Sequence, residues 1–166
     1  IVVDEKVADA FVEKFAAKAR TLPSGDPRKG EVVLGSLVAS QAADRVNALI
    51  ADGIAKGAKL VCGGVMPGTI LPATIVDHVT PNMRIYGEES FGPVVTVVRV
   101  GSTEEAIRVA NDTEYGLAAA VFGRDIARAL AVARRIESGI CHINAPTVHD
   151  EPQMPFGGMK ASGYGR

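Results

Sequence analysis

The sequence predicts an α/β fold, a three-layer arrangement in which helices cover both faces of an open, mainly parallel sheet. Apolar runs at 94–100, 117–122 and 140–144 alternate with two segments of helical periodicity, and the connections are short. Such runs are typical of strands buried on both faces of a parallel sheet, joined by right-handed crossovers. The 166 residues, 47% apolar and 22% charged, suit one domain with a real core.

The first eighty residues contain two predicted helices and two predicted strands. Asp4 is a suitable N-cap for a helix whose apolar residues recur at helical spacing from residue 7 to residue 19. Ser40 is placed to cap a second helix, with an apolar stripe at 46, 49, 50 and 54, and Gly57 is placed to end it. Short strands are predicted at 59–62 and 73–76.

The later elements follow a regular order. The run 94–100 is predicted to be one buried strand in which only Arg99 is exposed. Ser102 and Glu105 form the pattern of a capping box, which begins a helix. Asp125 caps the next helix, predicted to continue to residue 136. The segment from 145 onward is a loop rich in proline and glycine, and loops of this length are usually functional or linkers.

Composition argues against several classes of partner. Lys and Arg number 18 against 19 Asp and Glu, so the net charge of −1 gives no reason to expect nucleic acid or an anionic membrane. No apolar stretch is long enough to span a bilayer. Two cysteines make no disulfide framework and favour a reducing cytoplasm. The chain has no initiator Met and ends in a loop, so we expect a piece of a longer protein, although a processed chain would look the same.

The reactive residue types offer little by themselves. Cys141 and His142 are neighbours on a predicted strand and therefore point to opposite faces, so they cannot act on each other as a catalytic pair. We expect Cys141 and Cys62 to be small core residues. The histidines have no carboxylate or cysteine at metal-ligand spacing, so no metal site is expected. The segment 157–163 has the residue types of a phosphate loop but not their order, and we interpret it as a tight turn.

The stretch GEESFGPVV, residues 87–95, holds the most specific chemistry. Glu88 and Glu89 cannot both be buried without partners, because an isolated buried carboxylate costs too much. One carboxylate is expected to be solvated, and the other is suited to accept the two hydrogen bonds that a ribose diol offers. Phe91 lies two residues on and could pack against a bound nucleotide. The alternative is a charged loop that caps the edge of a sheet.

Four ordered motifs resemble those of the NAD(P)-dependent aldehyde dehydrogenase family, and the resemblance covers essentially the whole chain. They are EESFGPVV (88–95), ANDTEYGLAAAVF (110–122), GICHIN (139–144) and MPFGGMKASGYGR (154–166). The segment PTVHDEPQMPFGG (146–158) is most similar to enzymes that act on aromatic aldehydes, such as salicylaldehyde, vanillin or benzaldehyde dehydrogenases. Gly35 is followed by Ser36 where many relatives have Gly-Pro, which affects only a loop.

The resemblance implies a cofactor, NAD or NADP, and an aldehyde substrate. Glu89 would bind the hydroxyls of the nicotinamide ribose, Phe91 would pack against that ribose and the nicotinamide, and Arg45 would approach the adenosine end. The resemblance also implies residues that line the aldehyde tunnel or contact a ring hydroxyl: Phe156, Val148 and His149, with Asp150 beside them.

The family's reaction needs groups that do not match any residue of this chain. In the family a cysteine thiolate attacks the aldehyde, hydride leaves to the nicotinamide, and water hydrolyses the thioester with a glutamate as base. By the resemblance, the nucleophile and the nucleotide-binding domain lie upstream of residue 1 and the oligomerisation strand lies downstream. We therefore expect residues 1–166 to be a truncated catalytic domain, inactive alone, from a cytoplasmic homodimer or homotetramer. The alternative is a standalone, non-catalytic α/β binding module.

Overall fold

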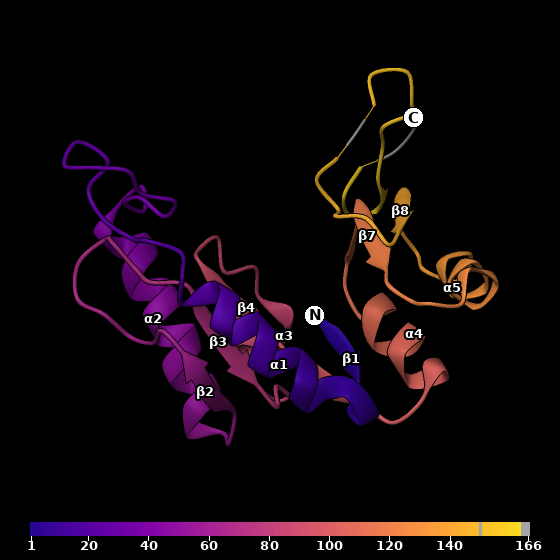
Figure 1. Ribbon diagram of the computed structural model, residues 1–166, viewed down its shortest axis with the longest axis horizontal. Helices are drawn as coiled ribbons and strands as arrows, with labels where there is room; N and C mark the ends of the chain where they lie inside the picture. The colour runs from indigo at the N-terminus through magenta and orange to yellow at the C-terminus, as the bar shows by residue number, and fades with distance from the viewer. Residues whose placement is uncertain (150, 164–166) are drawn as a thin grey trace. The chain divides into compact units, whose positions relative to one another are not determined.

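The computed structural model describes residues 1–149 and 151–163, which form two compact units (Figure 1). The first unit comprises residues 1–101 and the second begins at Ser102. Both units combine helices with short strand pairs, and among the described residues three of the five pairs are parallel, so the predicted α/β class is confirmed. No helix within the described ranges is long and apolar enough to cross a membrane.

The strands of the first unit form a three-stranded sheet and a separate strand pair. A three-stranded sheet has the order β2–β3–β4, in which β3 is parallel to β4 and antiparallel to β2, and β1 pairs with β5 in parallel. The strands are β1 (Val2–Asp4), β2 (Lys59–Cys62), β3 (Thr74–Asp77), β4 (Val94–Thr96) and β5 (Val98–Val100). The helices are α1 (Glu5–Ala19), α2 (Ser40–Ala55) and the short α3 (Arg84–Gly87).

Helices cover both faces of β3. Successive residues of a strand point to opposite faces, and Ile75 and Val76 belong to different cores. Ile75 packs in a buried cluster with residues of α1, among them Val12. Val76 packs in a second cluster with residues of α2, among them Leu49. This separation gives the helix–sheet–helix layering that the apolar pattern predicts.

Local capping signals are mostly confirmed. The side chains of Asp4, Ser102 and Asp125 each accept a backbone N–H at the start of a helix, at 3.0, 3.2 and 3.0 Å. The predicted cap at Ser40 is wrong, because Ala39 is the N-cap of α2 and makes no side-chain hydrogen bond there. Gly57 adopts a φ of 102° just after α2, as its predicted role requires.

The run 94–100 differs from its prediction in two ways. It is divided into β4 and β5 around Val97, which is fully buried and whose N–H still donates to the carbonyl of Val76 at 2.9 Å. Arg99 is not an exposed residue on a buried strand. Its guanidinium binds both carboxylate oxygens of Asp77 (3.1 and 2.7 Å) and one of Asp9 (2.7 Å). Asp77 is 1% exposed, so this arginine neutralises a buried charge.

The second unit is built on a strand–helix–strand crossover. Strand β7 (Ala118–Val121) runs parallel to β8 (Ile140–Ile143), with α5 (Ile126–Ala133) between them in sequence (Figure 1). Helix α4 (Thr103–Asn111) precedes this crossover. The strands predicted at 117–122 and 140–144 are confirmed with shorter bounds, while α5 ends three residues before the predicted 136. A further antiparallel pair joins β6 (Tyr115–Gly116) to β9 (Met159–Lys160).

Candidate functional site

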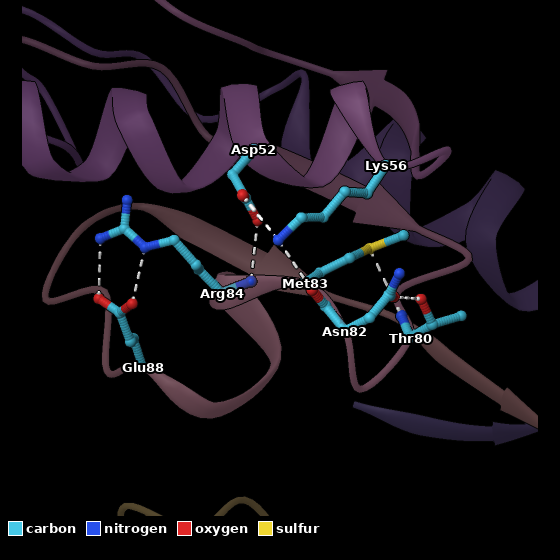
Figure 2. A network of polar contacts seen from close by, with 7 residues as sticks. All are labelled: Asp52, Lys56, Thr80, Asn82, Met83, Arg84 and Glu88. Atoms are coloured by element: carbon cyan, nitrogen blue, oxygen red, sulfur yellow. Dashed lines mark hydrogen bonds and ion pairs between the residues drawn. The ribbon is translucent and has the colours of Figure 1, made fainter.

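The loop between α3 and β4, residues 88–93, carries the predicted carboxylate and aromatic side chain. Glu88 is turned back onto α3, where Arg84 donates from Nε (2.8 Å) and Nη2 (3.1 Å) to its two carboxylate oxygens, as Figure 2 shows. The Arg84 hydrogen bonds lower the pKa of Glu88, so this carboxylate is ionised and already occupied. Glu88 is therefore a poor candidate for binding a diol.

Glu89 is the carboxylate that remains available. Its side chain is exposed, and within residues 1–149 and 151–163 no hydrogen bond or ion pair engages its carboxylate. Its main chain, by contrast, is held: the Glu89 carbonyl accepts a hydrogen bond from Nη2 of Arg45. A carboxylate on a fixed backbone with free oxygens is suited to accept two hydroxyl donors.

Phe91 is presented to solvent by an unusual backbone. Its side chain is 78% exposed and its φ is 49°, a left-handed conformation that costs a bulky residue about 1–3 kcal/mol. The next residue, Gly92, lies against α2, where an added Cβ would be 2.7 Å from Cγ2 of Val46. An exposed aromatic ring held in a strained turn provides a flat apolar surface for a ligand.

Arg45, the third residue assigned to the cofactor, lies on α2 beside this loop. Besides the Glu89 carbonyl it contacts the Ser90 carbonyl, 3.5 Å from Nη1. The structure thus brings Arg45, Glu89 and Phe91 together in the first unit. The Glu89 carboxylate could accept hydroxyl donors and the exposed Phe91 ring could pack against a flat group, but binding of a cofactor by these residues stays a prediction.

The residues assigned to the aldehyde form a separate group in the second unit. Val148 and Phe156 are 89% and 57% exposed, so neither belongs to the core of the described unit. The His149 imidazole lies near Glu151, with 3.5 Å between Nε2 and Oε1. Asp150 lies outside the described residues. Val148, His149 and Phe156 belong to the loop after β8, as predicted, and their contact with an aldehyde stays a prediction.

The base of this loop is anchored by contacts that sequence reasoning missed. Lys160 donates to the carbonyls of Asn111 (2.8 Å) and Thr113 (3.1 Å) and pairs with Glu137 at 2.6 Å. A Cβ on Gly139 would lie 1.7 Å from the Gly157 carbonyl oxygen, so the loop crosses the start of β8 in direct backbone contact. The only sequence signal for this anchor is the glycine pair and lysine of the segment 157–163.

Neither cysteine has the surroundings of a nucleophile. Burial raises the pKa of the Cys141 thiol, which disfavours the reactive thiolate. The Cys62 side chain is buried and its sulfur lies 3.7 Å from the Ala73 carbonyl. Among the described residues, no three His, Cys, Asp or Glu side chains gather to hold a metal ion.

Comparison with known proteins identifies the family. The model of the aldehyde dehydrogenase family matches residues 1–166. A vanillin dehydrogenase of Pseudomonas fluorescens is 60% identical over 165 residues, which are 99% of this chain and 34% of that protein. A crystal structure of a salicylaldehyde dehydrogenase from Pseudomonas putida G7, complexed with salicylaldehyde, is 53% identical with a TM-score of 0.95, covering 99% of this chain and 34% of that one.

Two further solved relatives contain a nicotinamide cofactor. A glyceraldehyde-3-phosphate dehydrogenase from Bacillus halodurans C-125, complexed with NADP, is 36% identical with a TM-score of 0.94, and the match covers 99% of this chain and 34% of that one. An aldehyde dehydrogenase from Mycobacterium tuberculosis, complexed with NAD+, is 35% identical with a TM-score of 0.91, covering 100% and 35%.

The chain therefore belongs to the aldehyde dehydrogenase family. The resemblance carried by the four motifs is confirmed, including the similarity to enzymes named for aromatic aldehydes. The chain spans about a third of the length of the curated relatives it matches.

Proposed function

We propose that these residues are part of an enzyme that oxidises an aromatic aldehyde to the carboxylate with NAD+ or NADP+. The observation that carries the proposal is that Glu89, whose carboxylate has no partner among the described residues, and the exposed Phe91 lie on one loop fixed to α2. The similarity to a vanillin dehydrogenase and to a salicylaldehyde dehydrogenase supports the aromatic substrate class.

In this proposal the first unit binds the nicotinamide and its ribose. Glu89 accepts hydrogen bonds from the two ribose hydroxyls, a charge-assisted interaction stronger than a neutral one. Phe91 packs against the ribose and the nicotinamide ring. When bound, the nicotinamide supplies the hydride acceptor for the aldehyde. The chain's own contribution is to hold that acceptor in one orientation, which raises the rate by positioning.

The loop after β8 is the proposed aldehyde-binding segment. The Phe156 ring and the Val148 side chain are exposed apolar surface of the kind that a planar aromatic aldehyde covers. His149 can donate to or accept from a ring hydroxyl, as in salicylaldehyde or vanillin. An apolar wall with one polar group favours a hydroxylated aromatic ring over a plain alkyl chain.

The nucleophile is proposed to come from another part of the polypeptide, because Cys62 is buried and the pKa of Cys141 is raised. Residues 1–166 are then part of a catalytic domain, and the whole protein is proposed to be a cytoplasmic homodimer or homotetramer.

The test is a steady-state assay of the full native polypeptide that contains these residues. Vanillin, salicylaldehyde and an aliphatic aldehyde of similar size are each supplied with NAD+ and with NADP+. The proposal predicts reduced cofactor and carboxylate product, with a kcat/KM for the aromatic aldehydes about tenfold or more above the aliphatic one. No cofactor reduction with any aldehyde would overturn the function, and a preference for the aliphatic aldehyde would overturn the substrate class.

A further inference from the structure

We propose that Arg45 is a positioning residue that fixes the direction of the Glu89 carboxylate through the main chain, rather than a residue that contacts the adenosine end of the cofactor. This inference rests on the proposed function. The guanidinium of Arg45 makes its main-chain contacts in the absence of a ligand.

The contacts of Arg45 are with two consecutive carbonyls of the loop. Nη2 donates to the Glu89 carbonyl, and Nη1 lies 3.5 Å from the Ser90 carbonyl. A guanidinium presents its donors as a rigid planar fork, so engaging both carbonyls restricts rotation of the peptide units on either side of Ser90. The orientation of Glu89 and the entry into Phe91 depend on these peptide units.

The loop is already fixed on both sides of this stretch. Upstream, Asp52 of α2 accepts the Arg84 N–H at 2.9 Å and pairs with Lys56 at 2.8 Å (Figure 2). The Lys56 ammonium also donates to the Asn82 carbonyl at 2.8 Å, and Arg84 holds Glu88.

Downstream, Gly92 lies against Val46 of α2, and the Pro93 carbonyl accepts the Thr74 N–H at 2.8 Å. Residues 89–91 therefore form a short span between two fixed points.

This span contains Phe91, whose backbone is in the left-handed region. The positive φ of Phe91, 49°, is unfavourable for an aromatic residue and persists only where surrounding contacts impose it. Arg45 supplies such a contact from one turn of α2, next to Val46. Without the guanidinium we expect the span to relax, so that Glu89 and Phe91 no longer face one ligand together.

The first test needs no ligand. Hydrogen–deuterium exchange of the full native polypeptide is measured in wild type, Arg45→Met and a matched control, Arg28→Met, which removes an exposed arginine paired with Asp26 in the same unit. We expect faster exchange across residues 88–92 in Arg45→Met, with little change at Arg28→Met. Unchanged exchange in Arg45→Met would overturn the positioning role, whatever the activity of the enzyme.

The second test separates positioning from direct cofactor contact. Single-turnover hydride transfer is measured with NAD+ and with NADP+ for Arg45→Met, Arg45→Lys, Glu89→Gln and the Arg45→Met/Glu89→Gln double variant. We expect a fall of about tenfold in Arg45→Met, equal for the two cofactors, with partial recovery in Arg45→Lys.

In the Glu89→Gln background the same change should cost much less, because Arg45 acts through Glu89. Full additivity, or a shift in the NAD+/NADP+ ratio, would assign Arg45 to the cofactor itself and overturn the inference. A wild-type enzyme without aldehyde oxidation would instead refute the proposed function, and the exchange experiment would still decide the role of Arg45.

Discussion

Replacing Glu89 by Gln isolates the role of the free carboxylate. Because the side chain is exposed and has no partner among the described residues, the free energy of unfolding should change by less than about 0.5 kcal/mol. Hydrogen bonds to a charged group contribute about 1.5–3 kcal/mol and neutral ones about 1 kcal/mol. The amide should therefore lose about 1–2 kcal/mol of cofactor interaction, or roughly five- to thirtyfold.

The assay combines calorimetric titration of the cofactor with single-turnover hydride transfer, and thermal unfolding of the same samples serves as the stability measurement. Glu88→Gln is the matched control, since it changes the adjacent carboxylate, which Arg84 already binds. Its effect on cofactor binding should be several-fold smaller than that of Glu89→Gln. Equal effects of the two substitutions, or unchanged binding and hydride transfer in Glu89→Gln, would refute the assignment of the ribose to Glu89.

Three other changes test the surrounding structure. Gly92→Ala places a Cβ 2.7 Å from the buried Val46 side chain, so calorimetry should show weaker cofactor binding and thermal unfolding a loss of about 1–3 kcal/mol; unchanged affinity would contradict the close packing. Asp77→Asn removes the buried carboxylate that pairs with Arg99 and leaves the guanidinium only its ion pair with the exposed Asp9, so denaturant unfolding should show a loss of about 3 kcal/mol near neutral pH. Burial opposes ionisation of Asp77, but the Arg99 hydrogen bonds lower the pKa of its carboxyl group. The stabilisation of the fold by ionised Asp77 is therefore complete above about pH 4 and is lost as the pH falls through the lowered pKa. If the Asp77→Asn variant lost stability with acid as steeply as the wild type, this assignment would be wrong. Lys160→Met releases the base of the aldehyde loop, so the aldehyde KM should rise by about tenfold while calorimetric cofactor affinity stays constant; a change in cofactor affinity alone would contradict the anchor.

Local features were predictable because they depend on residues near one another in sequence. The caps at Asp4, Ser102 and Asp125 follow from side chains that bind backbone two or three positions away. The N-cap predicted at Ser40 was wrong because serine also occurs within the first turn of helices. Only the backbone shows that Ala39 is the N-cap and that Ser40 is the first residue of α2. The motif at 87–95 located the loop, in which Glu89 and Phe91 are exposed, and their binding of a cofactor stays a prediction.

Features that depend on distant partners were not predictable from one sequence. The apolar pattern predicted that Arg99 is exposed to solvent. Its partners Asp77 and Asp9 are 22 and 90 residues away in sequence, so the pattern around Arg99 gives no sign of them. Arg45 and the Glu89 carbonyl are 44 residues apart, and no pattern reveals that the guanidinium binds main chain. The sequence predicted that Lys160 is part of a tight turn. The structure shows that its ammonium group donates to the carbonyl of Asn111, the last residue of α4.

The central claim is that these residues belong to an enzyme that moves a hydride from an aromatic aldehyde to a nicotinamide cofactor. The most direct measurement uses the full native polypeptide with vanillin carrying deuterium at the aldehyde carbon, followed by mass spectrometry of the cofactor and the aromatic product. We predict one deuterium in the reduced cofactor and the aromatic carboxylate in equal amount. Product formation without deuterium in the cofactor, or no reduction of either NAD+ or NADP+, would contradict the claim.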